Sequence, residues 1–306
     1  MLPLSTLLVA LPLVLATTAP KRGLCHVPSD DHPTDDTIWT AAPNSPLTWY
    51  YNYKSEPSQA YASDHSLQFI PMLWGASATD TGTPFLDSVR AQRAAGRNIS
   101  HVLGFNEPDG WHSVGGSDMP PALAASVWRA QLEPLRVDDG IKVGAPAVMG
   151  SPDGFIWLEQ WFSECKGGCN PDFIPVHFYG DFEALANHIG QIMGTYPGLD
   201  VWVTEWAYPR KDLETTKGFF NTSTEWFDRM ENITRYSYFG AFRSDVSNVG
   251  PNAAMLTEQG KLTDIGSWYL GGAATNNAPK EGGAGRAARF SGWALVVIGM
   301  GMWVWL

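Results

Sequence analysis

The chain has 306 residues and a formal net charge of −11 at neutral pH. No stretch is basic enough to follow a phosphate backbone, which excludes nucleic acid as the expected partner. The length suits one (β/α)8 barrel, which typically takes about 250 residues, or two smaller domains. Aromatic residues make up 12% of the chain and include 14 Trp. Most of them will be core, and exposed indole faces could also stack on sugar rings.

The first 19 residues predict a secretory signal peptide. Residues 7–15 form an apolar stretch of the length of a signal-peptide core, and small residues follow at once. The stretch before this core carries no Lys or Arg, which departs from the usual pattern. A buried N-terminal helix is the alternative, which Pro3 and Pro12 disfavour. A dibasic pair follows, so we expect residues 20–22 to form a short propeptide.

Between residues 23 and 272, apolar runs alternate with amphipathic segments. Such alternation predicts parallel strands joined by right-handed helical crossovers. Eight strand candidates favour a closed (β/α)8 TIM barrel, of class α/β, as a single domain. The expected strands are residues 23–27, 47–53, 68–74, 101–106, 142–148, 172–179, 199–205 and 235–242. The expected helices are residues 85–97, 120–135, 154–165, 182–195 and 217–232, with a small hairpin at 256–263 before a short closing helix.

Glu107 stands where a buried strand has to end. Residues 101–109 read HVLGFNEPD, an apolar run that stops at a polar turn. Pro108 cannot donate a ladder hydrogen bond, so the strand should end near Glu107. Barrels carry their chemistry at the C-terminal ends of their strands. The alternative is a surface acid in an ordinary turn, because Asn, Pro and Asp are common loop residues.

A second acid, Glu205, lies at the end of another buried run. Residues 201–208 read VWVTEWAY, an apolar and aromatic segment with this one acid in it. A buried acid in such a segment is costly unless it is paired or functional. Two glutamates that end two buried strands, both among aromatic residues, indicate the carboxylate pair that hydrolyses glycosidic bonds.

The C-terminal segment predicts a glycolipid anchor. Small residues are followed by a polar spacer and then by an uncharged apolar tail at residues 290–306. This order is typical of a GPI attachment signal, whose tail is removed. We expect residues 273–289 to hold the attachment site and the spacer, with Asn276 or Asn277 as the attachment residue. The alternative is a transmembrane anchor, for which the tail falls short of the about 20 residues that a spanning helix needs.

Three sequons agree with a secreted glycoprotein. They begin at Asn98, Asn221 and Asn232, and each has the Asn-X-Ser/Thr pattern of an N-glycosylation site. Such triplets also arise by chance, so they support secretion without establishing it.

The three cysteines divide into a pair and a single residue. Cys165 and Cys169 enclose a Gly-rich loop that suits a local disulfide. A zinc site is the alternative, but no second Cys or His pair has suitable spacing. Cys25 then remains as a buried free thiol.

Eight motifs between residues 21 and 270 carry a family resemblance. They are KRGL (21–24), WYYNY (49–53), FIPMLWG (69–75), VLGFNEPD (102–109), VGAPAV (143–148), DFIPVHFYG (172–180), VWVTEW (201–206) and RYSYFGAF (235–242). In this order they resemble glycoside hydrolase family 128 of clan A, the fungal and bacterial β-1,3-glucanases of the alkali-sensitive-linkage type. The first strand departs from the family, because it reads GLCHV where the family is closer to GLAYN.

The resemblance implies a retaining endo-β-1,3-glucanase that needs no cofactor or metal. It implies Glu107 as acid/base and Glu205 as nucleophile, with a covalent glycosyl intermediate. By the same resemblance Asn106 would bind the 2-hydroxyl of the sugar at the cleavage point. Tyr179 would contact the nucleophile, and His177 is either a substrate contact or a satisfied histidine of the barrel interior.

Aromatic and amide side chains near the strand ends are the candidate sugar contacts. Trp74 is the first candidate for a stacking platform and Trp111 the second, with Asn52 as a further contact. For each of them, core packing is the alternative. Trp206 follows the expected nucleophile and should face the opposite side, against a helix.

The resemblance leaves more than one function open. The first hypothesis is a monomeric, GPI-anchored fungal cell-wall enzyme that acts on β-1,3-glucan. An anchored glucan-binding protein on the same barrel, with little or no catalysis, is the alternative, because fold does not determine function. A hydrolase of another β-glucan is the third reading.

Overall fold

The computed structural model describes residues 21–279. The expected signal peptide, the apolar tail and most of the spacer lie outside the described residues, so these expectations remain predictions. Within the described residues, no helix is both long and apolar enough to cross a membrane.

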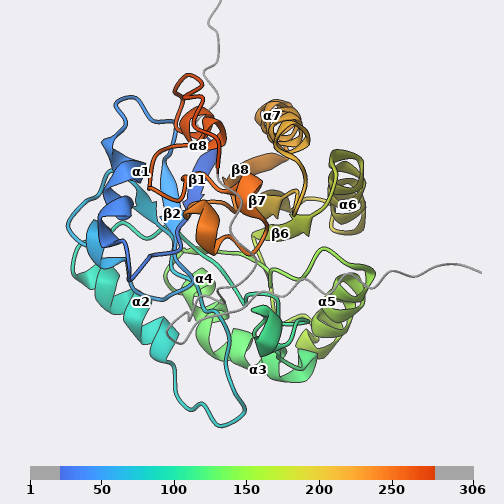
Figure 1. Ribbon diagram of the computed structural model, residues 1–306. Helices are drawn as coiled ribbons and strands as arrows, with labels where there is room; N and C mark the ends of the chain where they lie inside the picture. The colour runs from blue at the N-terminus through green and yellow to red at the C-terminus, as the bar shows by residue number, and fades with distance from the viewer. Residues whose placement is uncertain (1–20, 280–306) are drawn as a thin grey trace, which may run out of the picture.

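Eight parallel strands form the centre of the molecule (Figure 1). They are β1 (Arg22–Cys25), β2 (Trp49–Tyr51), β3 (Gln68–Phe69), β4 (His101–Val102), β5 (Lys142–Val143), β6 (Phe173–Tyr179), β7 (Asp200–Ala207) and β8 (Ile233–Tyr238). Six of them are hydrogen-bonded in the order β3-β2-β1-β8-β7-β6, and β4 pairs with β5. Isolated parallel bridges connect the two groups, Met72 with Leu103 beyond β3 and Gly144 with Phe173 beside β5. The strands therefore follow one another in cyclic order, as in a (β/α)8 barrel.

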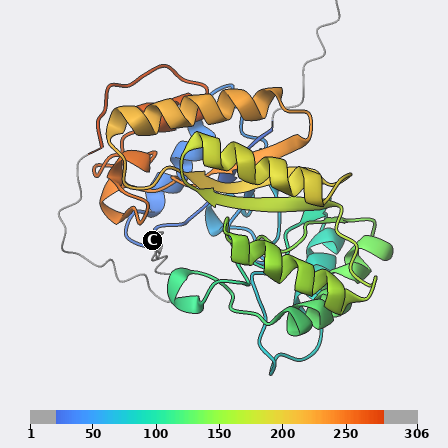
Figure 2. The same cartoon turned by 90° about the vertical axis from the view of Figure 1, so that its right-hand side faces the viewer.

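Helices surround the strands on the outside. They are α1 (Ile38–Ala41), α2 (Pro84–Ala94), α3 (Pro121–Gln131), α4 (Glu133–Val137), α5 (Pro152–Cys165), α6 (Phe182–Thr195), α7 (Leu213–Arg229) and α8 (Asp264–Tyr269). Short 3₁₀ segments, η1 (Pro33–Thr37), η2 (Gln59–Tyr61), η3 (His112–Val114), η4 (Ser244–Val246) and η5 (Pro251–Ala253), lie in the connections. Figure 2 shows α5, α6 and α7 beside one another outside β6 and β7.

Side-chain caps set several helix starts. Asp181 accepts a hydrogen bond from the backbone N–H of Ala184 at the start of α6, and Asp212 accepts one from Thr215 at the start of α7. Each cap satisfies one N–H that the first helical turn leaves without a partner. The expected helix at 120–135 is two helices, because Pro134 lacks the N–H that would continue α3.

Aromatic side chains around the guanidinium of Arg235 fill the interior of the barrel near the N-terminal ends of the strands. The rings of Phe173 and Trp202 stack with centroids 4.0 Å apart, and the guanidinium of Arg235 lies 4.4 Å from the Trp202 ring. Burial lowers the pKa of Arg235 to about 10. The ring of Trp49 lies so close to Gly23 that a Cβ on Gly23 would overlap it. This packing closes the N-terminal end of the barrel and leaves the C-terminal end for function.

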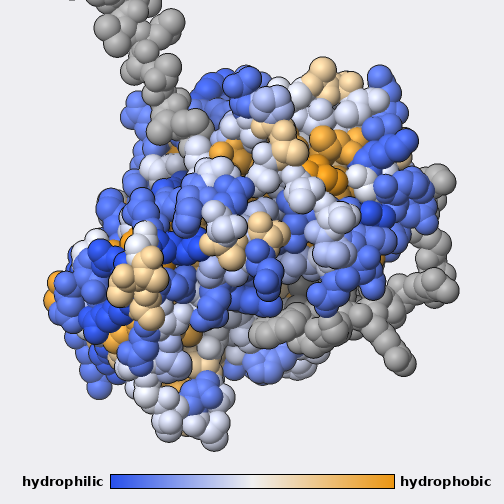
Figure 3. All heavy atoms as spheres, turned by 90° about the vertical axis from the view of Figure 1, so that its left-hand side faces the viewer, coloured by the Kyte–Doolittle hydropathy of each residue, from blue (hydrophilic) through white to orange (hydrophobic). Residues whose placement is uncertain are grey.

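The outer surface shown in Figure 3 is largely hydrophilic, with small groups of hydrophobic residues between. The predicted hairpin is present, because Leu256 pairs antiparallel with Leu262. α8 then follows as the short closing helix.

Candidate active site

An irregularity between β6 and β7 places two of the predicted site residues side by side. The register of the two strands shifts between Val176 and His177, so that His177 lies opposite Glu205 and Thr204 is the extra residue. Bulges of this kind re-aim side chains next to functional sites. The carbonyl of Thr204 accepts a hydrogen bond of 3.0 Å from the hydroxyl of Tyr51, which satisfies a group that the irregular ladder would leave open.

Glu107 follows β4 in a left-handed backbone conformation. Its φ is 40°, which is uncommon for a residue with a side chain. Its N–H donates to the carbonyl of Ala147 at 2.7 Å, and its own carbonyl accepts from the N–H of Gly110 at 2.9 Å. Gly116 packs against this turn so closely that a Cβ there would overlap the carbonyl of Gly110. The loop thus holds a strained backbone in place, as functional sites often do.

His177 lies between the two glutamates. Its Nδ1 is 3.0 Å from Oε1 of Glu107, and its Nε2 is 3.5 Å from Oε1 of Glu205. One nitrogen or oxygen atom from each of the three side chains lies within 4.8 Å of the other two, and all three residues are buried. Two acids that are far apart in sequence, one in the turn after β4 and one in β7, therefore form one compact group with His177.

Glu205 accepts a hydrogen bond from a tyrosine hydroxyl on each oxygen. Tyr53 donates to Oε1 at 2.7 Å, and Tyr179 donates to Oε2 at 2.5 Å. Burial, together with the charge of Glu205, holds the pKa of both phenols well above its usual range, so both hydroxyls stay protonated. Because both oxygens of Glu205 accept hydrogen bonds, these contacts favour the ionised carboxylate, which has acceptors only.

The electrostatics of the group are tightly coupled. Burial raises the pKa of Glu205, and the charge of Glu107 adds to this effect. His177 and the hydrogen bonds from Tyr179 and Tyr53 act in the opposite direction, but the pKa stays above the usual value. Burial disfavours a charged His177, yet the charges of Glu205 and Glu107 outweigh it and raise the pKa of the imidazole. The residues therefore share protons as a unit.

Asn106, next to Glu107, has one buried polar atom without a hydrogen-bond partner in the described part of the chain. Its Nδ2 donates to the carbonyl of Gly115 at 3.0 Å, while its buried Oδ1 has no partner within residues 21–279. The backbone N–H of Asn106 donates to the carbonyl of Trp74 at 2.9 Å, which puts Trp74 beside the site. A buried acceptor without a partner is costly, so it points to a ligand that donates a hydrogen bond.

The other predicted sugar contacts differ in how far their side chains are buried. Trp74 is half-buried, with its ring 5.8 Å from that of His112, and Trp111 is 71% exposed. Asn52 is buried, and its Nδ2 donates to the carbonyl of Glu56 and to the hydroxyl of Ser58. Both amide hydrogens of Asn52 are thereby used inside its own loop, and its Oδ1 accepts from the backbone N–H of Lys54 at 3.2 Å. An amide oxygen can accept a second hydrogen bond, so sugar contact by Asn52 stays a prediction.

Trp206 packs as expected, away from the glutamates. It is fully buried, and its ring lies 5.5 Å from Phe219, 5.8 Å from Phe220 and 5.1 Å from Phe227 of α7. The alternation of side chains along a strand explains this, because Glu205 and Trp206 face opposite sides.

Sequence reasoning missed the place of three residues in the site, although it correctly expected one of them, Cys25, as a buried free thiol. Tyr53 contacts Glu205 directly, and Cys25 lies 3.0 Å from the Tyr53 hydroxyl. The signal was the spacing of Tyr51 and Tyr53, which puts both on one face of an extended segment. Asp109 is the third, because burial raises its pKa to about 6 beside Glu107.

His26, the other departure in the first strand, is fully buried. Its Nδ1 lies 2.8 Å from the hydroxyl of Ser58, and its Nε2 lies 2.8 Å from Oδ1 of Asp36. This histidine therefore ties the first strand to two loops, and it is a satisfied structural residue.

Glu107, His177 and Glu205 also form the group within residues 21–279 whose atoms are close enough to share a metal ion. The donor set fits a metal poorly, because Tyr53 and Tyr179 already donate to both oxygens of Glu205. The Nδ1 of His177 is likewise hydrogen-bonded to Glu107. The arrangement suits proton transfer between organic groups better.

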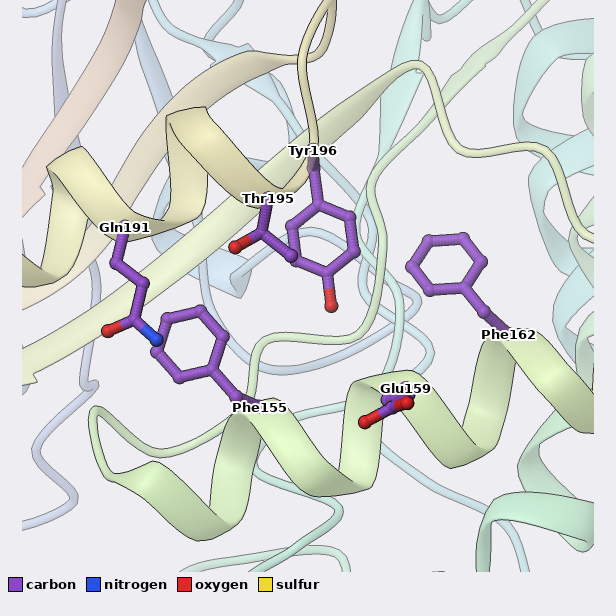
Figure 4. Close-up of a pocket in the computed structure, with 6 residues that line it drawn as sticks. All are labelled: Phe155, Glu159, Phe162, Gln191, Thr195 and Tyr196. Carbon is purple, nitrogen blue, oxygen red and sulfur yellow. The ribbon is translucent and has the colours of Figure 1, made fainter.

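A separate groove of about 500 Å³ lies between α5 and α6 (Figure 4). Its lining residues all belong to these two helices or follow them directly, and they are Phe155, Glu159, Phe162, Gln191, Thr195 and Tyr196. None of them belongs to the carboxylate cluster, so the groove lies in the outer helical layer rather than at the barrel mouth.

The residues predicted for processing lie at the surface. Asn98, Asn221 and Asn232 are all exposed. Asn276 is exposed and Asn277 half-buried, both beyond α8. The disulfide Cys165–Cys169 is present at the end of α5.

Comparison with known proteins places this site in a family. Residues 23–269 match the family model described as glycosyl hydrolase catalytic core. Over 258 residues the chain is 32% identical to alkali-sensitive linkage protein 1 of Schizosaccharomyces pombe, and the match covers 82% of this chain and 44% of that protein. The chain thus spans less than half the length of this curated relative.

Two solved structures illustrate the range of the relatives. A curdlan-specific exo-β-1,3-glucanase of glycoside hydrolase family 128 from Blastomyces gilchristii, in complex with glucose, has a TM-score of 0.65 at 25% identity, covering 83% of this chain and 98% of that chain. A family 128 oligosaccharide-binding protein from Trichoderma gamsii has a TM-score of 0.64 at 22% identity, covering 86% and 96%. Endo-β-1,3-glucanases of family 128 are also among the structures that match. These solved structures are all family 128 proteins. The chain therefore belongs to the glycosyl hydrolase catalytic core family.

Proposed function

We propose that this protein is a retaining endo-β-1,3-glucanase with Glu107 as acid/base and Glu205 as nucleophile. The observation that carries the proposal is the close approach of the two carboxylates, since one oxygen of Glu107 lies within 4.8 Å of one oxygen of Glu205. Retaining glycosidases keep their carboxyl groups about 5–5.5 Å apart, whereas inverting enzymes separate them by about 6.5–9.5 Å to admit a water.

The hydrogen bonds around each acid support the division of roles. Glu205 accepts hydroxyl donors on both oxygens, which favours the anion that a nucleophile must be. Among the described residues, the hydrogen bonds of the Glu107 side chain involve only Oε1, on the side of His177. The second oxygen of Glu107 is then available to hold a proton toward the leaving group.

In the first chemical step, an oxygen of Glu205 attacks the anomeric carbon as the glycosidic C–O bond breaks. Glu107 gives its proton to the departing glucan oxygen, so the leaving chain departs as an alcohol. The open Oδ1 of Asn106 can accept the 2-hydroxyl hydrogen of the sugar bound at the cleavage point. The products of this step are a glycosyl ester on Glu205 and an ionised Glu107.

In the second step, Glu107 takes a proton from a water molecule, whose oxygen attacks the same carbon. The ester bond to Glu205 breaks, and both glutamates return to their starting states. Two inversions leave the β configuration unchanged.

The test uses the secreted protein on laminarin, with reducing ends and product lengths followed over time. Glu107→Gln should lose about 10²- to 10⁴-fold in rate, the usual contribution of a general acid. Glu205→Gln should lose nearly all activity. Early release of long and mixed oligosaccharides would indicate endo action, and release of glucose alone would contradict it.

Azide separates the two roles. With an activated β-glucoside substrate, Glu107→Ala plus azide should form a glycosyl azide of β configuration, because azide attacks the glycosyl-enzyme. Glu205→Ala plus azide should form the α product, because azide then attacks the substrate directly. An α product from Glu107→Ala and a β product from Glu205→Ala would instead make Glu107 the nucleophile and Glu205 the acid/base.

A binding protein without catalysis is the second candidate, because oligosaccharide-binding proteins are among the solved relatives. It predicts that the parent protein is retained by insoluble β-1,3-glucan yet releases no reducing ends, even at high protein concentration. A hydrolase of another β-glucan predicts release from that glucan and none from laminarin.

We further propose that the protein acts as a monomer at the cell surface or in the cell wall, held by a GPI anchor. The exposed positions of Asn98, Asn221 and Asn232 support glycosylation of a secreted protein. Release of the full-length protein from membranes by a phosphatidylinositol-specific phospholipase tests the anchor, and persistence on the membrane after treatment contradicts it.

A further inference from the structure

The hydroxyl of Tyr53 has two neighbours but only one proton. It lies 2.7 Å from Oε1 of Glu205 and 3.0 Å from Sγ of Cys25. An ionised carboxylate can only accept, so the proton of Tyr53 goes to Glu205. The oxygen of Tyr53 can then only accept from the sulfur, and the thiol of Cys25 has to be the donor.

The thiol is able to donate because it is buried and protonated. Cys25 ends β1 and is fully buried, and burial with the nearby charge of Glu205 raises the pKa of the thiol. The hydroxyl of Tyr51 is placed as a donor to the sulfur at 3.2 Å and to the carbonyl of Thr204 at 3.0 Å, and not as an acceptor from the thiol. A sulfur held between two phenols has a defined position, and its hydrogen has Tyr53 as its acceptor.

We propose that Cys25 is a positioning residue for Glu205, acting through Tyr53. A donor chain runs from the Cys25 thiol to the Tyr53 hydroxyl and then to Oε1 of Glu205. Each hydrogen bond polarises the next in such a chain, so Tyr53 donates more strongly than an isolated phenol. The chain also holds Tyr53 in place, whose backbone is left-handed with φ of 61°. The proposal rests on the proposed function, because its consequence is a more acidic nucleophile.

Cys25 is the last residue of β1, within the segment GLCHV. A side chain that cannot donate to the Tyr53 oxygen would leave that oxygen with a free acceptor and Glu205 with a weaker donor. The acidity of the nucleophile, and hence the acidic limit of activity, would then depend on the residue at the end of β1.

The kinetic test is the pH profile of kcat/KM on laminarin for four variants. Cys25→Ala should move the acidic limb to higher pH by about 0.3–0.5 pH unit, a fraction of what one hydrogen bond contributes. Cys25→Ser, which keeps a donor, should return the limb toward its original position. Tyr53→Phe should move it further, and Cys25→Ala should add nothing when Tyr53 is already Phe. Equal shifts of the limb in both backgrounds, or no shift in Cys25→Ala, would overturn the proposal.

A spectroscopic readout works without activity. Because Cys165 and Cys169 form a disulfide, Cys25 is the protein's one free thiol, and its S–H stretch in the infrared is unique. Tyr53→Phe should move this band to the frequency of an unbonded thiol, and an unchanged band would refute donation to Tyr53. Loss of hydrolysis in the parent, or full activity in Glu205→Gln, would instead refute the proposed function, so the two failures are distinguishable.

Discussion

Replacement of Tyr179 by Phe removes one hydroxyl and leaves the ring. The lost group donates to Oε2 of Glu205 at 2.5 Å. Hydrogen bonds to charged groups contribute about 1.5–3 kcal/mol, and about 1.4 kcal/mol corresponds to one pKa unit. The loss therefore raises the pKa of Glu205 by about 1–2, and we expect the lower end because Tyr53 still donates to the other oxygen.

The sign of the effect follows from which form is stabilised. Tyr179 donates to the carboxylate, so its loss disfavours the anion and moves the acidic limb of kcat/KM to higher pH. On that limb, kcat/KM should fall about tenfold at a given pH for each unit of pKa. At pH values above this limb, Glu205 is ionised in both the parent and Tyr179→Phe. The difference in kcat/KM between the two proteins should therefore become smaller.

The assay is the pH profile on laminarin, and Tyr238→Phe is the matched control. The hydroxyl of Tyr238 is also buried but has no hydrogen-bond partner within residues 21–279, so its loss should leave the limb in place. Circular dichroism at each pH checks that both variants stay folded. An acidic limb that stays where it is in Tyr179→Phe would refute the reasoning that this hydroxyl stabilises an ionised Glu205.

Three further outcomes follow from the geometry. Trp74→Ala should raise KM on laminarin because a stacking surface is lost, whereas Tyr196→Ala in the outer groove should leave KM unchanged; equal effects would contradict the placement of the cleft. Gly116→Ala should abolish most activity while the chain still folds, because its methyl group would displace the turn that holds Glu107; an unchanged rate would contradict this. Loss of the Cys165–Cys169 disulfide, which spans four positions, should cost about 2 kcal/mol of unfolding free energy without changing kcat/KM, as thermal unfolding and kinetics would measure.

The sequence predicted the bounds of helices and strands well where a clear local signal, such as a helix cap, marks the end of the element. The range 182–195 matches α6 at both ends, because Asp181 caps its start. Signals were weaker where strands are short. The expected strand at 68–74 has only two residues in regular pairing, because Pro71 has no N–H to continue the ladder. The same reason applies to the strand expected at 142–148, which contains Pro146.

The sequence likewise predicted some features of the candidate site and missed others. Glu107 and Glu205 could be recognised from sequence, because each ends an apolar run with an acid that burial makes costly. Of the contacts that tune them, the one between Tyr179 and Glu205 was expected from the family resemblance. The others could not be recognised, because they join segments far apart in the chain. Tyr53 and Glu205 are 152 positions apart, and His177 and Glu107 are 70 apart. No local pattern encodes such pairs.

By itself, the sequence determined the class of the protein. Alternating hydrophobic runs determine a barrel of strands and helices, since burial of apolar faces is a local property of each segment. The register shift between β6 and β7 was decided only by the tertiary structure. That shift puts His177 opposite Glu205, and one nitrogen or oxygen atom each of Glu107, His177 and Glu205 lies within 4.8 Å of the other two. The physical reason is that distances between strands depend on how the whole sheet packs and closes, which no single segment specifies.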